Sequence, residues 1–78
     1  MREKKPCAVV TFHTTAEAMA VEKACREKEI EGKLIPAPRV LSSDCGIAWK
    51  SPAQLRLKLE EMLEEEEIEH AGVYELEL

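Results

Sequence analysis

The sequence predicts an α+β protein of the ferredoxin-like, split βαβ class, with the element order β-α-β-β-α-β. Three observations support it. Short runs of strand-forming residues alternate with two helical stretches in this order. Pro36 and Pro38 cannot donate ladder hydrogen bonds, which places the second strand at a sheet edge. Glutamates alternate along the last strand, as suits the other edge. We therefore expect a four-stranded antiparallel sheet with two helices on one face.

The first strand and helix have clear local signals. Cys7 to Phe12 is a six-residue run rich in β-formers, which predicts a strand. Thr14 and Glu17 have capping-box spacing, with the Thr14 hydroxyl accepting from the amide three residues on while Glu17 reaches back. The helix is predicted to continue to about Lys28, and Gly32 ends the unit. Its expected apolar stripe consists of Ala20, Val21, Ala24 and Cys25.

The middle of the chain predicts two strands joined by a long loop. Residues 33–36 form the short second strand, and residues 46–50 form the third. Trp49 and Ile47 share one face of this central strand and are expected to be packed. The connection over residues 37–45 takes about nine residues, whereas a hairpin normally needs two to five. A long loop in a small domain is a candidate functional segment.

The second helix is predicted to begin with another capping box, from Ser51 to Gln54, with Pro52 at the first helical position. Gly72 predicts a turn, and the alternating residues from Val73 to Leu78 predict a half-buried last strand. The helices cover only one sheet face, so the opposite face, carrying residues such as Val9 or Val10, is a candidate homodimer surface. The apolar positions of the second helix are Leu55, Leu59, Met62 and Leu63, and those of the last strand are Tyr74, Leu76 and Leu78.

The length and the net charge of the chain exclude several classes of function. Seventy-eight residues predict one domain, residues 1–78, whose thin core leaves no room for a large internal cavity. The net charge is −5, with nine acidic against two basic residues over positions 56–78, which argues against nucleic acid as a partner. No apolar run approaches the roughly 20 residues that span a bilayer. The start has no apolar segment typical of a secretory signal, so we expect a cytoplasmic protein.

The cysteine pattern argues against metal and disulfide chemistry. Cys7, Cys25 and Cys45 are odd in number and widely spaced, without a Cys-x-x-Cys pair. His13 and His70 do not supply metal-ligand spacing. We expect no metal and no cofactor, and three free thiols. Cys25 lies on a helical apolar stripe and Cys7 begins a strand, so both are expected to be structural.

Cys45 ends the long loop and is the candidate reactive thiol. Antiparallel topology places this loop at the same rim as His13, Thr14 and the first helix N-terminus. That N-terminus and Arg39 would favour thiolate over thiol, whereas Asp44 opposes it. The alternatives are a small residue in a tight turn for Cys45 and a solvent-facing turn residue for His13. A Cys45–His13 nucleophile–base pair lacks an evident orienting residue, so we expect no enzyme.

The remaining loop residues are of types that can bind an anion or stabilise a turn. Ser42 and Ser43 can hydrogen-bond an anion or stabilise the turn itself. Gly46 permits close backbone approach or a positive φ. The candidate site therefore comprises Cys45 as nucleophile, with the binding residues His13, Thr14, Arg39, Ser42, Ser43 and Gly46.

The stretch from Leu34 to Gly46, with its Pro-x-Pro-Arg and Ser-Ser-x-Cys-Gly elements, resembles a small bacterial family. This is the putative selenium/sulfur (Se/S) carrier protein-like family, a domain of unknown function. Phe12-His13-Thr14 and the helix at Ala20-Val21-Glu22-Lys23 match its other elements, and the resemblance covers about residues 7–75. The sequence lacks the Cys-Pro-x-Pro motif of better-understood sulfur carriers.

The resemblance implies a persulfide or selenopersulfide on Cys45, with Arg39, Ser42, Ser43 and Gly46 as its loop. The implied partners are sulfur or selenium donor and acceptor proteins. The alternative is a non-catalytic protein-interaction or small-ligand-binding module, since ferredoxin-like domains serve many roles.

Overall fold

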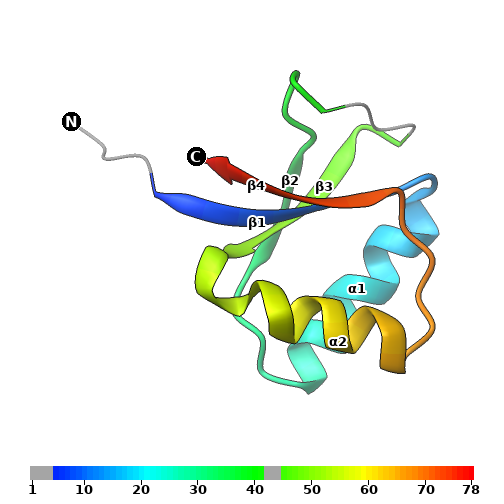
Figure 1. The fold of residues 1–78 in the computed structure, drawn as a ribbon. Coiled ribbons are helices and arrows are strands. Elements are labelled where there is room, and N and C mark those ends of the chain that lie inside the picture. Colours follow the sequence, from blue (N-terminus) through cyan, green and yellow to red (C-terminus); the bar gives the residue numbers. More distant parts are fainter. Residues whose placement is uncertain (1–4, 42–44) are drawn as a thin grey trace.

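In the computed structural model, which describes residues 5–41 and 45–78, four strands form one antiparallel sheet in the order β2-β3-β1-β4 (Figure 1). The two central strands are β1 and β3, and the two edges are β2 and β4. The described elements follow the order β-α-β-β-α-β, which confirms the ferredoxin-like α+β fold. They are β1 (Pro6–Thr11), α1 (Thr15–Glu27), β2 (Lys33–Pro36), β3 (Ile47–Pro52), a 3₁₀ turn (Ala53–Leu55), α2 (Arg56–Glu65) and β4 (Gly72–Glu77).

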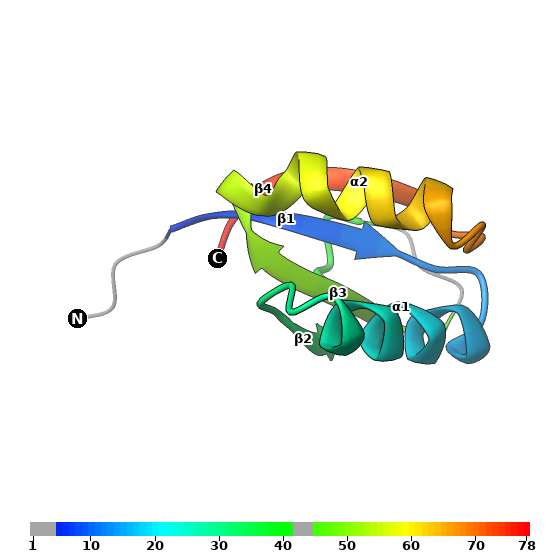
Figure 2. The ribbon, with the colours of Figure 1, turned by 90° about the horizontal axis from the view of Figure 1, so that it is seen from below.

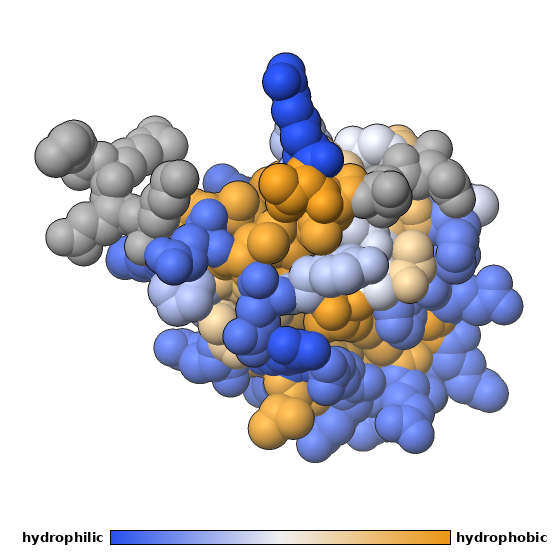
Figure 3. All heavy atoms as spheres, turned by 45° about the horizontal axis from the view of Figure 1, so that its top comes forward, coloured by the Kyte–Doolittle hydropathy of each residue, from blue (hydrophilic) through white to orange (hydrophobic). Residues whose placement is uncertain are grey.

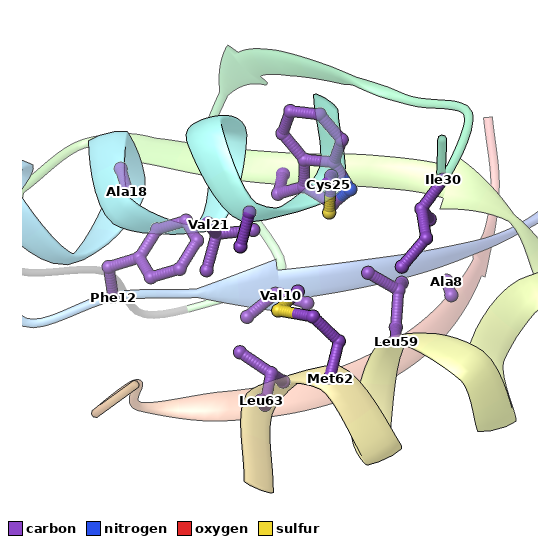
Figure 4. Close-up of a cluster of buried hydrophobic side chains, with 12 residues drawn as sticks. Ala8, Val10, Phe12, Ala18, Val21, Cys25, Ile30, Leu59, Met62 and Leu63 are labelled. Carbon is purple, nitrogen blue, oxygen red and sulfur yellow. The ribbon is translucent and has the colours of Figure 1, made fainter. Parts of the chain in front are cut away.

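Both helices cover the same face of the sheet (Figures 1 and 2). Ala8, Val10 and Phe12 point from β1 towards them, because alternate strand residues share a face. Figure 4 shows these side chains meeting those of α1 and α2 in one cluster. Trp49 and Ile47 also join this cluster, which confirms that they pack on one face. The main core therefore lies between the sheet and the helices.

Thr14 is confirmed as the N-cap of α1, and Glu17 reaches back as predicted, though to the amide of His13, the residue before the cap. The Glu17 amide donates to the Thr14 hydroxyl at 3.2 Å, and a Glu17 carboxylate oxygen accepts from the His13 amide at 2.7 Å. The predicted stripe is wrong in one position, because Ala18 is buried and Ala20 is exposed. The helix ends at Glu27 with Lys28 as its C-cap, as predicted. Just beyond it, the positive φ of 57° at Glu29 lets the Ile30 amide reach the Cys25 carbonyl at 2.8 Å.

The predicted second capping box is wrong. Ser51 and Pro52 are the last residues of β3, and α2 begins at Arg56 with no side-chain cap. The Ser51 hydroxyl instead accepts from the Trp49 indole N–H and donates to the Glu31 carbonyl, both at 2.7 Å. Because this buried hydroxyl is already hydrogen-bonded to both the Trp49 indole and the Glu31 carbonyl, it is not available to cap a helix.

Replacing the two buried hydroxyls should have opposite effects on stability. Ser51→Ala should lower the free energy of unfolding by about 1–3 kcal/mol, because it orphans the buried Trp49 N–H and the Glu31 carbonyl. Thr11→Val should be neutral or stabilising, because among the described residues the buried Thr11 hydroxyl has no hydrogen-bond partner. Urea unfolding measures both. Equal losses in the two variants would contradict this explanation.

The sheet face opposite the helices has its own apolar cluster. Cys7, Val9 and Ala48 are buried there, with four partly buried neighbours packed against them: Ile35, Ala37, Leu41 and Leu76. Of the two valines proposed for this face, Val9 lies on it and Val10 faces the helices. In Figure 3 apolar surface gathers in the upper middle of the molecule, interrupted by hydrophilic side chains.

The strand registers define the rows of this open face. Val9 pairs with Tyr74 on one side and with Lys50 on the other, and Lys50 pairs with Lys33. Leu76, opposite Cys7, follows the same parity, so the alternating apolar residues of β4 face away from the helices. Val73 is the residue of β4 that packs against the main core.

Candidate functional site

The loop between β2 and β3 passes from one face of the sheet to the other. Ala37 and Leu41 pack on the open-face cluster, whereas Cys45 packs against the helix-side core. The Ala37 amide donates to the Gly46 carbonyl at 2.9 Å, and the Leu41 amide donates to the Pro38 carbonyl at 3.0 Å. The two ends of the loop are thus held together while Leu41 anchors it to the sheet.

Cys45 lies at the end of this loop and is partly buried. Its Sγ donates to the Ile47 carbonyl at 3.4 Å. The next residue, Gly46, has a φ of 73°, and a Cβ placed there would meet no atom of the described residues within 4 Å. Within residues 5–41 and 45–78 nothing therefore covers the backbone beside the thiol, and the left-handed conformation explains the glycine. A thiolate at Cys45 would have to give up the hydrogen bond to Ile47, because that bond uses the thiol proton.

The other two cysteines are buried. Cys7 is 4% exposed, and its Sγ donates to the Lys5 carbonyl at 3.3 Å. Cys25 is fully buried between α1 and the sheet (Figure 4), and this burial raises the pKa of its thiol to about 11. The burial of Cys7 and Cys25 is consistent with the structural roles expected for them from the sequence. All three cysteines are free thiols.

His13 and Thr14 lie between β1 and α1, at the end of the sheet where β3 begins. Figures 1 and 2 both place this connection and the start of β3 at that end. The Thr14 hydroxyl is already used as the α1 cap. His13 is exposed, with Nδ1 3.5 Å from a Glu17 carboxylate oxygen. Both residues thus stabilise the start of α1, and either could face a ligand only in addition to that role.

Of the basic and hydroxyl residues proposed as binding residues in the loop, the structure describes only Arg39. Arg39 is exposed in the turn and forms no ion pair with any described residue. Its proposed influence on Cys45 stays a prediction. Ser42 and Ser43 lie outside the described residues, as does Asp44.

Within residues 5–41 and 45–78, no group of three or more His, Cys, Asp or Glu side chains could hold a metal ion. In the same ranges no helix is long and apolar enough to cross a membrane.

Sequence reasoning did not find the lysines that line a groove at the far end of the sheet, Lys5, Lys33 and Lys50. The spacing of these three lysines along the chain matches no pattern that would indicate a binding site. The strand register brings two of them together, and an explicit alignment of β2 with β3 would have been needed to find the pair.

A comparison with protein-family models matches residues 7–75, nearly the whole chain, to the family described as "Putative Se/S carrier protein-like". No curated protein and no solved structure matches the chain.

Proposed function

The chain belongs to the putative Se/S carrier protein-like family, and we propose that it carries sulfur or selenium as a persulfide or selenopersulfide on Cys45. The observation that supports this assignment most directly is the difference among the three thiols. Cys45 is partly exposed, whereas Cys7 and Cys25 are buried. A carrier needs a thiol that another protein can reach, and Cys45 meets that condition better than the other two.

The location of Cys45 suits transfer between proteins. The loop presents the thiol at the end of the sheet, and Gly46 leaves the adjacent backbone without a side chain. A donor protein can therefore approach the backbone beside the thiol, and the Cys45 sulfur is freed for attack when it gives up its hydrogen bond to the Ile47 carbonyl. Arg39, exposed in the same loop, would meet a negatively charged persulfide or an acidic partner surface.

The proposed chemistry is thiol exchange. The Cys45 thiolate attacks the terminal sulfur of a donor persulfide, a new S–S bond forms, and the donor thiolate leaves with the electron pair of the broken S–S bond. The attacking thiol first loses its proton to solvent, and no oxidant is consumed. Selenium would move in the same way from a selenopersulfide. An acceptor thiolate then takes the terminal atom and regenerates Cys45. The chain acts in this proposal as a carrier and not as an enzyme.

Intact-mass spectrometry tests the proposal. After incubation with sodium tetrasulfide and removal of excess reagent, the protein should gain the mass of one sulfur atom, and dithiothreitol should release it as sulfide. Cys45→Ser should abolish the gain, while Cys7→Ser, which alters another thiol, should retain it. A gain that persists in Cys45→Ser, or that depends on Cys7, would contradict the assignment.

A second function, a non-catalytic interaction module, is favoured by the apolar cluster on the open face. Val40, Tyr74 and Leu78 are exposed large apolar residues, and Leu41 and Leu76 are packed against that cluster. A homodimer through this face is the specific form of this alternative. Sedimentation equilibrium should then show a dimer that Cys45→Ser leaves intact. A protein that stays monomeric at all concentrations tested would contradict the homodimer proposal.

A further inference from the structure

A groove of about 830 Å³ lies at the end of the sheet opposite the Cys45 loop. There β1 and β2 begin and β3 ends, so residues from three strands line it. Its volume falls within the range of about 300–1,000 Å³ typical of small-molecule sites. The lining residues include Lys5, Pro6, Cys7, Lys33, Lys50 and Pro52.

The groove concentrates positive charge in an acidic protein. Lys33 and Lys50 are directly opposite each other in the β2–β3 register, so their side chains share one face. Lys5 lines the same groove, and Glu31 is the one acidic side chain among its described lining residues. Like charges placed opposite in an antiparallel pair destabilise the sheet. The fold therefore starts two lysine side chains from directly opposite positions on one face, an arrangement that costs some stability.

These lysines are not neutralised within the described part of the chain. Lys5, Lys33 and Lys50 form no ion pair with any residue in 5–41 or 45–78. By contrast, Lys28 pairs with Glu65 at 3.2 Å, and Arg56 pairs with Glu75 at 3.0 Å. Lys23 of α1 and Lys58 of α2 also lack an ion pair within the described residues, so what distinguishes the groove lysines is their position around one hollow, where an external anion can meet more than one of them.

The groove also has apolar walls. Pro6 and Pro52 lack backbone donors, and Leu78 adds an aliphatic side chain that is 37% exposed. We propose that this groove binds a small organic anion, with its charged head between Lys33 and Lys50 and its apolar body against Pro6, Pro52 and Leu78. The head could be a carboxylate or a phosphate, since an ammonium group accommodates both. This site is independent of Cys45 and of the carrier role.

Titration with octanoate and with octyl phosphate, at constant ionic strength and followed by ¹H–¹⁵N correlation spectra, tests the proposal. Saturable shifts should be confined to the groove, including the amides of Gly32, Lys33 and Lys50. Trp49 provides a second readout, because its indole N–H bonds to Ser51, which lines the groove. The tighter of the two ligands identifies the head group. Equal shifts with sodium chloride would overturn the proposal.

Matched variants separate binding from folding. Lys33→Met with Lys50→Met keeps the aliphatic stems and should weaken binding at least about tenfold, in line with the loss of charged hydrogen bonds. The same double variant should be as stable as the wild type or more so, because like-charge repulsion is removed. Lys23→Met with Lys58→Met, which lie outside the groove, should bind as the wild type does. Unchanged affinity in the groove variant, or equal loss in the control, would overturn the site.

Discussion

Iodoacetamide at neutral pH should modify Cys45 at least about tenfold faster than Cys25. Burial raises the pKa of Cys25 to about 11, so very little of this thiol is thiolate in the neutral range, and the thiolate is the form that reacts. Full burial in the core adds a further barrier, because the reagent must reach the sulfur. Cys45 is partly exposed and has no comparable barrier. Peptide mass spectrometry after timed labelling measures all three rates in one sample.

The pH dependence and the unfolded chain provide the controls. The rate at Cys25 should keep rising with pH until about 11, because its thiolate forms only there. In concentrated guanidinium chloride the three rates should converge, because burial no longer distinguishes the thiols. Cys7, 4% exposed, should also react more slowly than Cys45 in the native protein. If Cys45 is no faster than Cys7, the tight-turn explanation of Cys45 should replace the carrier proposal.

Gly32→Ala should destabilise the protein by about 3 kcal/mol, near the upper end of typical overpacking costs. A Cβ at this position would lie 2.5 Å from the Lys50 carbonyl oxygen and 2.6 Å from both the Ser51 hydroxyl and the Trp49 ring. Real Cβ atoms do not approach this closely, and neither backbone nor a buried indole moves away cheaply. Such a loss is a large share of the stability of a small domain. Urea unfolding measures it.

Gly46→Ala is the matched control, because the requirement for glycine there has another cause. Its φ of 73° disfavours a side chain, but a Cβ would meet no atom within 4 Å in the part of the chain that the structure describes. The expected cost is about 1 kcal/mol, the penalty of a left-handed conformation for alanine. A Gly32→Ala variant no less stable than Gly46→Ala would show that the segment before β2 can move away from β3.

The candidate site was predictable from sequence only in outline. Loop length and antiparallel topology placed Cys45 at the same end of the sheet as His13, and the structure agrees. Neither could show that His13 and Thr14 are engaged with Glu17. They also could not show that Leu41 anchors the loop on the open face, because that contact joins residues far apart in sequence.

Local chemistry by itself determined the element order and the start of α1. Thr14 and Glu17 are three residues apart, so a capping box needs no distant partner, and prolines exclude β2 from the sheet centre. Only the tertiary structure decided the role of Ser51. The spacing from Ser51 to Gln54 fits a capping box as well as the spacing from Thr14 to Glu17 does. Once β3 packs against the segment before β2, however, the Ser51 hydroxyl is hydrogen-bonded to Trp49 and Glu31 instead. Register likewise decided that Lys33 meets Lys50, because cross-strand contacts follow strand alignment and not spacing along the chain.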